Sequence, residues 1–255
     1  MIPLYPDLQG KVALVTGGSR GIGAVVAGAL AATGMTVAVN GRDTKALDAT
    51  VKKIGEDGGE AVALPGDVTD PEALSEMRRA CETGLGPVDV LVAFAGGGTV
   101  RPAPIEDVTP EEWHSCVDAN LTATFLTLRT FLPSMKSRRR GTIVTMASSA
   151  ARTPSPAPAP YAAAKAGVIM LTRHAAAEAA PHGVRINCVS PATILTDRTA
   201  QHITGDLRDR LTAHYPLARL GTPEDVATAT LYLASDASSW LTGITLDITG
   251  GTVMT

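Results

Sequence analysis

Tyr161 and Lys165 are the residues whose types and spacing point most directly to acid–base chemistry. They stand four residues apart in an Ala-rich stretch with helical spacing, so both side chains project from one face of a helix. A phenol, with a reference pKa of about 10, is a poor base near neutral pH, but a nearby ammonium group favours its ionised form. The pair therefore predicts proton transfer, with Tyr161 as donor or acceptor and Lys165 tuning it.

A glycine-rich turn near the amino end is typical of a phosphate-binding loop. The run is Thr16-Gly17-Gly18-Ser19-Arg20-Gly21-Ile22-Gly23, and it joins a β-branched apolar stretch to a helical one. Glycines permit a tight turn and a close approach to a pyrophosphate, whose charge a helix N-terminus stabilises. The Gly-x-x-x-Gly-x-Gly spacing differs from the general Gly-x-Gly-x-x-Gly fingerprint. Because a strand-like run precedes it and a helical stretch follows it, we nevertheless interpret it as a dinucleotide-binding turn.

The chain resembles the short-chain dehydrogenase/reductase family, including its 3-oxoacyl-ACP reductase-like members, over nearly its whole length. The resemblance rests on motifs in the family's order: the glycine turn, Asp67-Val68, Ala95-Gly96, Asn120, Ser148, Tyr161, Lys165 and residues 191–196. It implies hydride transfer between a nicotinamide cofactor and a carbonyl or alcohol. Ser148 and Tyr161 would polarise the carbonyl, and Tyr161 would supply the proton. By the same resemblance, Lys165 would also hydrogen-bond the nicotinamide ribose. Asn120 lies within an expected helix over 113–130; by the resemblance it would open that helix locally and order a water that relays protons to Lys165.

Cofactor choice depends on where the second expected strand ends, at Asn40-Gly41-Arg42. A carboxylate there hydrogen-bonds the adenosine ribose and repels a 2′-phosphate, but this chain has Gly41 at that position. The guanidinium groups of Arg42 and of Arg20 in the glycine turn suit a phosphate. These residues favour NADP(H) over NAD(H), the alternative being that Arg42 is a solvated surface charge.

The resemblance also implies a larger set of cofactor contacts. They are Gly17, Ser19, Arg20, Gly21, Ile22, Gly23, Arg42, Asp67, Val68, Ala95, Gly96, Tyr161, Lys165, Pro191, Ile194 and Thr196. Asp67-Val68 would hold the adenine and Ala95-Gly96 would border the cofactor. The backbone of Ile194 and the hydroxyl of Thr196 would hold the nicotinamide carboxamide.

Two positions depart from the family's pattern. Ala93-Phe94 stands where the family has two asparagines, which leaves the local rigidity of the cofactor site in question. Ala192 replaces the usual glycine after Pro191 and would narrow the nicotinamide pocket slightly.

Seven short β-branched apolar runs predict the strands that must position these residues. They cover residues 12–16, 36–40, 61–65, 88–93, 142–147, 185–190 and 245–248. The stretches between them, such as 22–33 and 161–180, have helical spacing, which is the pattern of right-handed βαβ units. We predict one α/β domain over 1–255: a doubly wound, Rossmann-type sheet of about seven parallel strands with helices on both faces. Its ligands should bind outside the carboxyl ends of the strands.

Composition and charge exclude several other classes of protein. The chain is 45% hydrophobic but only 4% aromatic, which suits a parallel sheet covered on both faces. A net charge of −3 gives no attraction for nucleic acid or an anionic membrane. Cys81, Cys116 and Cys188 lack the spacing of a zinc or redox site and predict no metal and a reducing compartment. With no long apolar run, the expected location is the cytoplasm.

Two irregular stretches adjoin the motifs and are interpreted as the substrate site. Residues 150–160 contain four prolines and lie between the two catalytic hydroxyls, so they should form part of the substrate wall. Residues 192–215 predict a lid, whose apolar members either face the substrate or only pack the lid to the domain: Leu195, Ile203, Leu207, Leu211 and Tyr215. A moderately apolar ketone or a 3-oxoacyl group fits this site. Arg152 and Arg198 favour an acidic substrate instead, and the sequence does not decide between the two.

The resemblance extends to assembly. The expected helix over 223–234 resembles one that packs between subunits, and the family expectation is a homotetramer. Two alternative functions stay open: an NAD(H)-dependent alcohol dehydrogenase, and a protein that senses NADP(H) without turnover. The presence of both Tyr161 and Lys165 favours an enzyme.

Overall fold

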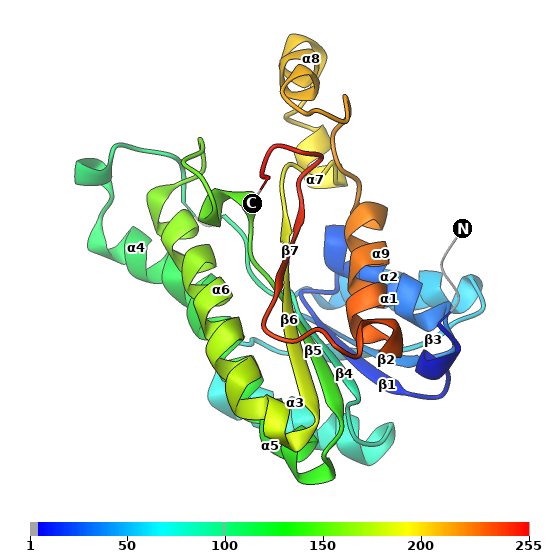
Figure 1. Ribbon diagram of the computed structural model, residues 1–255. Coiled ribbons are helices and arrows are strands. Elements are labelled where there is room, and N and C mark those ends of the chain that lie inside the picture. The colour runs from blue at the N-terminus through cyan, green and yellow to red at the C-terminus, as the bar shows by residue number, and fades with distance from the viewer. Residues whose placement is uncertain (1–4, 99, 255) are drawn as a thin grey trace.

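Seven parallel strands form a single sheet in the computed structural model, which describes residues 5–98 and 100–254 (Figure 1). The strands are β1 Val12–Thr16, β2 Thr36–Gly41, β3 Glu60–Pro65, β4 Val90–Ala93, β5 Gly141–Met146, β6 Val184–Pro191 and β7 Thr245–Ile248. Their order is β3-β2-β1-β4-β5-β6-β7, with every neighbouring pair parallel. The predicted fold class is confirmed, and each strand ends within two residues of its predicted bounds.

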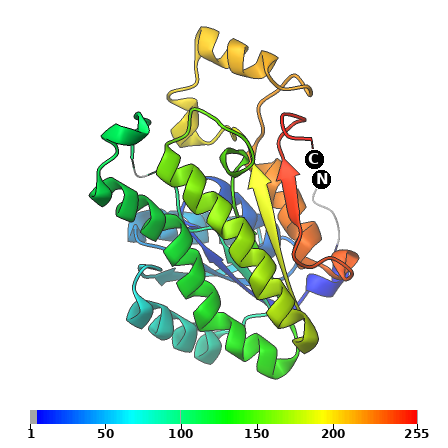
Figure 2. The same cartoon turned by 60° about the vertical axis from the view of Figure 1, so that its left-hand side comes forward.

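Nine α-helices connect the strands in this part of the chain and cover both faces of the sheet. They are α1 Gly21–Ala31, α2 Thr44–Glu56, α3 Pro71–Gly84, α4 Pro110–Val117, α5 Ala123–Arg138, α6 Ala159–Ala179, α7 Asp197–Ala200, α8 Gly205–Ala213 and α9 Pro223–Ala234. Helices α1, α2 and α9 lie on one face, and α3, α5 and α6 on the other (Figures 1 and 2). Residues 113–130 are helical throughout, as predicted, and the helix is widened around Asn120 by a π-helical turn, Asp118–Thr122, that joins α4 to α5.

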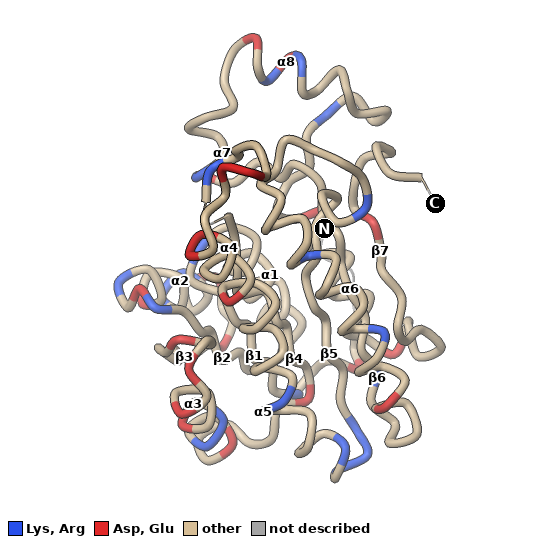
Figure 3. Tube along the Cα trace, turned by 90° about the vertical axis from the view of Figure 1, so that its left-hand side faces the viewer, with Lys and Arg blue, Asp and Glu red and all other residues tan. Residues whose placement is uncertain are grey.

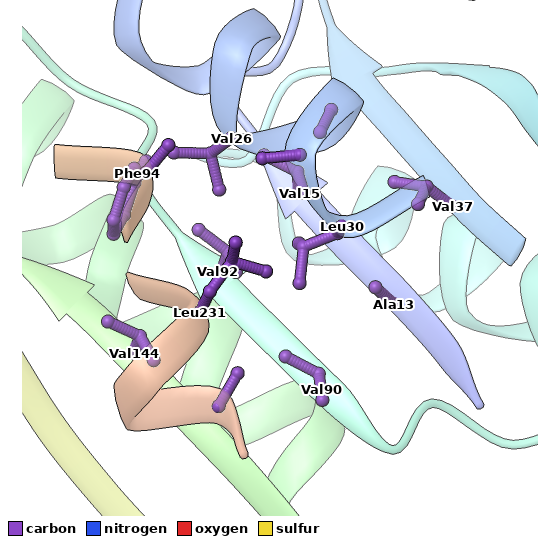
Figure 4. Packing of buried hydrophobic residues seen from close by; sticks show 14 of the residues in the cluster. Ala13, Val15, Val26, Leu30, Val37, Val90, Val92, Phe94, Val144 and Leu231 are labelled. Atoms are coloured by element: carbon purple, nitrogen blue, oxygen red, sulfur yellow. The ribbon is translucent and has the colours of Figure 1, made fainter. Parts of the chain in front are cut away.

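Small aliphatic side chains fill the space between the sheet and its helices. Figure 4 shows the cluster under α1 and α9, where Val15 and Val92 from the sheet meet Leu30 and Leu231 from the helices. These four side chains are at most 1% exposed, and each contributes roughly 1.5–3 kcal/mol by leaving water. A second cluster, which includes Leu91 and Phe131, fills the opposite face.

The chain reverses direction across the sheet between β1 and β4. From β1 it runs outward to β2 and β3, then returns to place β4 on the other side of β1. Such a reversal opens a crevice at the carboxyl ends of the two strands, which is where doubly wound sheets bind ligands. Helices α7 and α8 lie beyond this edge, and α8 stands apart from the main body in both ribbon views (Figures 1 and 2).

Charged residues of both signs are interspersed along the elements, as Figure 3 shows. No helix in residues 5–98 and 100–254 is both long enough and apolar enough to cross a bilayer.

Candidate active site

The glycine turn bends where β1 meets α1, at the mouth of the crevice. Gly17 has φ +67°, and a Cβ there would lie 2.9 Å from the backbone of Ala95 at the end of β4. A Cβ at Gly23 would lie 2.2 Å from the carbonyl oxygen of Gly17, so that only glycine lets α1 begin so close to β1. The N-terminus of α1, at Gly21, therefore opens into the crevice, as a pyrophosphate requires.

The two arginines predicted to bind a 2′-phosphate lie on either side of the end of β2. Arg20 forms an ion pair with Asp43, and Nη1 of Arg42 lies 3.5 Å from Oδ2 of Asp67. The arginine side chains are 70% and 80% exposed, so both ion pairs are weak and solvated. The sequence interpretation missed Asp43. Its local signal was its position before α2, which it caps by accepting a hydrogen bond from the Ala46 amide.

Asp67, the predicted adenine contact, is held by a local turn after β3. Its Oδ1 accepts hydrogen bonds from the amide and the hydroxyl of Thr69, at 2.9 and 2.7 Å. The Thr69 amide is the main cause that lowers the pKa of this carboxyl, and the Arg42 charge adds to it. The following residue, Val68, is buried.

Asn120 lies in the π-helical turn and clamps the loop that follows β4. Its Nδ2 donates to the carbonyl oxygens of Gly97 and Cys116, at 3.0 and 2.8 Å, and its Oδ1 accepts from the Gly97 amide at 2.9 Å. A Cβ at Gly96 would lie 2.6 Å from the same Oδ1. The completely buried Asn120 side chain therefore fixes the backbone at one border of the crevice.

Packing and the Thr16 hydroxyl hold the segment in which Ala93-Phe94 stands in place of two asparagines. Phe94 is 3% exposed and belongs to the apolar cluster with Val26 (Figure 4). The Thr16 hydroxyl accepts a hydrogen bond from the Ala95 amide, at 3.1 Å, and so joins the ends of β1 and β4. These contacts brace the segment without the missing amides.

Ser148, Tyr161 and Lys165 come together at the carboxyl end of β5. Ser148 follows this strand and caps a short 3₁₀ turn, its Oγ accepting from the Ala150 amide at 3.2 Å. Burial raises the pKa of the Tyr161 phenol, and a hydrogen bond with Ser148 opposes that rise. Two hydroxyls are therefore held together, which is the arrangement needed to bind one substrate oxygen and exchange its proton.

Lys165 is completely enclosed beneath Tyr161. Its side chain is 1% exposed, Nζ donates to the carbonyl oxygen of Met146 at 2.8 Å, and Nζ lies 5.7 Å from the centre of the Tyr161 ring. Burial lowers the pKa of Lys165 from 10.5 to about 8. An ammonium group so close to the phenol favours the phenolate.

The segment after β6 crosses towards the glycine turn. Ile194 is buried and forms an isolated bridge with Gly221, while the Thr196 methyl carbon lies 3.4 Å from the position of a Cβ on Gly21. Thr196 also caps α7 and bonds to Thr199. Pro191 ends β6, so the structure brings the predicted nicotinamide segment to the same crevice as the predicted phosphate turn.

The apolar residues of the predicted lid divide into two kinds. Tyr215 is 8% exposed and its hydroxyl accepts a hydrogen bond from the Thr193 amide, so it anchors the segment to the body. Leu207, on α8, is 40% exposed. Leu195, Ile203 and Leu211 are partly buried.

The arginines considered for an acidic substrate differ in their surroundings. Arg152 forms an ion pair with Asp247 on β7, whereas Arg198 is exposed on α7. No group of three or more His, Cys, Asp or Glu residues that could hold a metal occurs in 5–98 or 100–254.

Two cavities bear on the site. A pocket of about 310 Å³ lies between α4 and the first turn of α6, and its walls include Ile105, Val108, Trp113 and Pro160, the residue before Tyr161 in the chain. A larger cavity of about 780 Å³ lies between α1, α2 and α9 and reaches the cofactor region only at its rim, through Ser19 and Arg20. Asn120, Ser148, Tyr161 and Lys165 line neither cavity, and we assign the larger one no role in the reaction because it lies behind the glycine turn, among α1, α2 and α9.

Comparison with known proteins gives matches over almost the whole chain. A family model described as Enoyl-(Acyl carrier protein) reductase matches residues 17–253. The 3-oxoacyl-(acyl-carrier-protein) reductase of Synechocystis sp. is 39% identical over 249 residues, which are 97% of this chain and 98% of that protein. The 3beta-hydroxysteroid dehydrogenase 1 of Eggerthella lenta is 38% identical over 251 residues, 97% of this chain and 95% of that protein. A crystal structure of a 3-oxoacyl-(acyl-carrier protein) reductase with bound NAD from Brucella melitensis has a TM-score of 0.89 at 35% identity, covering 99% of this chain and 94% of the other.

Proposed function

This chain belongs to the short-chain dehydrogenase/reductase family, and we propose that it is an NADP(H)-dependent oxidoreductase acting on a neutral carbonyl or alcohol. The observation that carries the proposal is the buried Lys165 beneath Tyr161, with Ser148 bonded to the same phenol. A protein that only senses the cofactor needs no such proton-transfer group. The glycine turn fits a dinucleotide, because a Cβ at Gly17 or Gly23 would collide with backbone and only glycine permits so tight a turn before α1.

In the proposed mechanism, the chain's own residues control the proton. Ser148 and Tyr161 hydrogen-bond the substrate oxygen, and Tyr161 gives it a proton in reduction or removes one in oxidation. The Lys165 ammonium stabilises the phenolate that results, and Asn120 keeps the Gly96-Gly97 backbone in place. Residues of the glycine turn and of 191–196 would hold a nicotinamide cofactor, which would supply or accept the hydride when bound.

The proposed preference for NADP(H) rests on Arg20 and Arg42. Both guanidinium groups lie at the end of β2, are largely exposed and are paired only loosely with carboxylates, so they can turn to a 2′-phosphate. Bound NAD in the similar Brucella melitensis structure favours the alternative, an NAD(H)-dependent dehydrogenase.

Arg42→Asp is expected to reverse this preference. The substitution removes a charge-assisted contact and adds a carboxylate that repels the 2′-phosphate, so kcat/KM for NADPH should fall about 10- to 100-fold relative to NADH. Steady-state kinetics with both cofactors measures the ratio, and Arg79→Asp on α3 is the matched control. An unchanged ratio in Arg42→Asp would remove Arg42 from the phosphate site.

The proposed substrate is a ketone, 3-oxoacyl group or alcohol whose apolar part enters the pocket beside α6. Pro160 in the wall of that pocket directly precedes Tyr161 in the chain, and Trp113 and Ile105 are also in its walls. We propose that residues 192–215 close over the site, with α8 as the part free to move.

Turnover of NADPH with unbranched ketones of increasing length tests the function directly. Rising kcat/KM with chain length is expected, and binding without any turnover would revive the sensor interpretation.

We also propose a cytoplasmic homotetramer. Phe125 on α5 and Met170 on α6 are about half exposed on two adjacent helices, as apolar residues covered by a second subunit would be. Cys81, Cys116 and Cys188 are buried free thiols, which suits a reducing compartment. Sedimentation velocity of the purified protein would contradict the tetramer by showing a smaller species.

A further inference from the structure

Arg152 and Asp247 form an enclosed ion pair between the substrate wall and the edge strand of the sheet. Nη2 of Arg152 lies 2.9 Å from Oδ2 of Asp247, and the two side chains are 18% and 13% exposed. The arginines of the proposed phosphate site are four times as exposed. A pair so little exposed has a defined geometry, because water screens it less and competes less for its hydrogen bonds than at the surface.

The arginine end of this pair is connected to Ser148 through one tight turn. The Ser148 carbonyl oxygen accepts from the Ala151 amide, and the Ser149 carbonyl oxygen accepts from the Arg152 amide, both at 2.9 Å. Ser148 Oγ accepts from the Ala150 amide within the same turn. A displacement of Arg152 would therefore be transmitted to the Ser148 hydroxyl over a few hydrogen-bonded residues.

The aspartate end lies beside the other wall of the crevice. Asp247 pairs in register with Ser190 on β6, and Ser190 precedes Pro191, where the proposed nicotinamide segment begins. Oδ1 of Asp247 and Oγ of Ser190 are buried without hydrogen-bond partners in the described part of the chain. The ion pair with Arg152 is therefore a main restraint on the orientation of this carboxylate.

Stability alone does not account for a buried pair of this kind. Moving two charges out of water costs about as much as their attraction returns, and a well-packed apolar pair often serves a fold equally well. Compared with an apolar pair, an arginine–carboxylate pair also fixes the position of one side chain relative to the other. That geometry is useful here because the turn being fixed carries a catalytic hydroxyl.

We propose that the Arg152–Asp247 ion pair positions Ser148 for catalysis and removes the Arg152 charge from the substrate wall. The inference rests on the proposed function, in which Ser148 holds the substrate oxygen. It makes Arg152 and Asp247 positioning residues, since they act through Ser148. It also deepens the substrate assignment: the wall next to Ser148 offers no uncompensated cation to a carboxylate substrate, so the preferred substrates are neutral there.

Arg152→Gln and Asp247→Asn test the positioning role, with Arg138→Gln as the matched control. Arg138 also pairs with a largely buried carboxylate, Asp89, but at the amino ends of the strands. Each test variant should lower kcat for ketone reduction about tenfold, the equivalent of one hydrogen bond lost in the transition state, with the Kd for NADPH unchanged within about twofold. Arg138→Gln should lower the Tm while leaving kcat unchanged.

The pH profile of alcohol oxidation distinguishes positioning from a general loss of structure. The Ser148 hydrogen bond lowers the pKa of Tyr161, so a displaced Ser148 should move the rising limb of the profile to higher pH. Lys165 and Cys116 also face the phenol, and both are unchanged in these variants. A wild-type kcat and profile in Asp247→Asn and Arg152→Gln would overturn the inference.

A double variant keeps the inference testable if the single variants fold poorly. Arg152→Met with Asp247→Leu replaces the pair by apolar side chains of similar size and should restore the Tm. A low kcat at restored Tm would support positioning, and a wild-type kcat would overturn it. Wild-type turnover tests the proposed function separately, because the inference depends only on differences between the variants and an active wild type.

Discussion

Tyr161→Phe is expected to lower kcat about 10²- to 10⁴-fold in both reaction directions, which is the usual contribution of a positioned general acid or base. Phenylalanine keeps the ring that packs over Lys165 but removes the only group at this position that can carry the proton. Because the glycine turn and α1 are untouched, the Kd for NADPH should change by less than about twofold. Single-turnover oxidation of NADPH and fluorescence titration measure the two quantities.

Tyr232→Phe on α9 is the matched control for this substitution, because it removes a phenolic hydroxyl outside the site and should leave kcat unchanged. Normal turnover by Tyr161→Phe would show that another group carries the proton. A large loss of NADPH affinity in the same variant would mean that the phenol serves the cofactor and not the substrate.

The sequence was sufficient to predict the centre of the sheet because strands such as β1 and β4 are buried on both faces. Runs such as 12–16 and 88–93 are continuous and β-branched, and the structure confirms them within two residues. β4 begins two residues later than predicted, at Val90. Just before it, the Asp89 carboxylate accepts from the Val12 amide and pairs with Arg138, contacts that no local pattern reveals.

Periodicity was sufficient to predict the helical run over 113–130, and the family resemblance placed its local opening at Asn120, but periodicity does not record how a helix is hydrogen-bonded. Asn120 lies in the π-helical turn, and its amide binds Cys116 behind it and Gly97 across the crevice. The contact with Gly97 joins residues 23 positions apart. Propensity favours helix on both sides of Asn120, so the π-helical geometry depends on a tertiary contact that local pattern does not reveal.

Ion pairs account for most of what sequence reasoning could not place in the site. Arg20 and Arg42 were predicted to bind a 2′-phosphate, and Arg152 was one of two alternatives for recognising an acidic substrate; each has a carboxylate partner in the structure, which the sequence did not reveal. The partner of Arg152 is 95 residues away and depends on the position of β7. Which carboxylate an arginine meets therefore depends on the fold and not on the neighbouring sequence. Exposure then distinguishes the two cases: Arg42 is largely exposed and free to turn to a ligand, whereas Arg152 is enclosed with its partner.

Lys165→Met is expected to abolish most of the activity while stabilising the folded protein near neutral pH. Loss of the ammonium group leaves the Tyr161 phenolate without its cation, so kcat should fall at least about 100-fold. Burial lowers the pKa of Lys165 from 10.5 to about 8, which corresponds to ~3 kcal/mol spent on burying the charge. The lost hydrogen bond to Met146 offsets roughly 1–2 kcal/mol of this. The free energy of unfolding should thus rise by about 1–2 kcal/mol at pH 7.

The pH dependence of that stabilisation has a defined sign. At pH 7 the lysine is protonated in both the folded and the unfolded state, so the wild type carries the full cost of burial. As the pH rises through about 8 the folded lysine loses its proton, whereas the unfolded lysine keeps its proton up to 10.5. The unfolded wild type then binds more protons, and its free energy of unfolding rises relative to the variant. Urea unfolding at pH 7 and pH 9.5 should show the advantage of Lys165→Met shrinking, while Lys53→Met, at an exposed lysine, should show little change. An advantage that grows with pH would mean that the folded protein binds the Lys165 proton more tightly than the unfolded chain does, so that the site raises the pKa of Lys165 and burial does not dominate it.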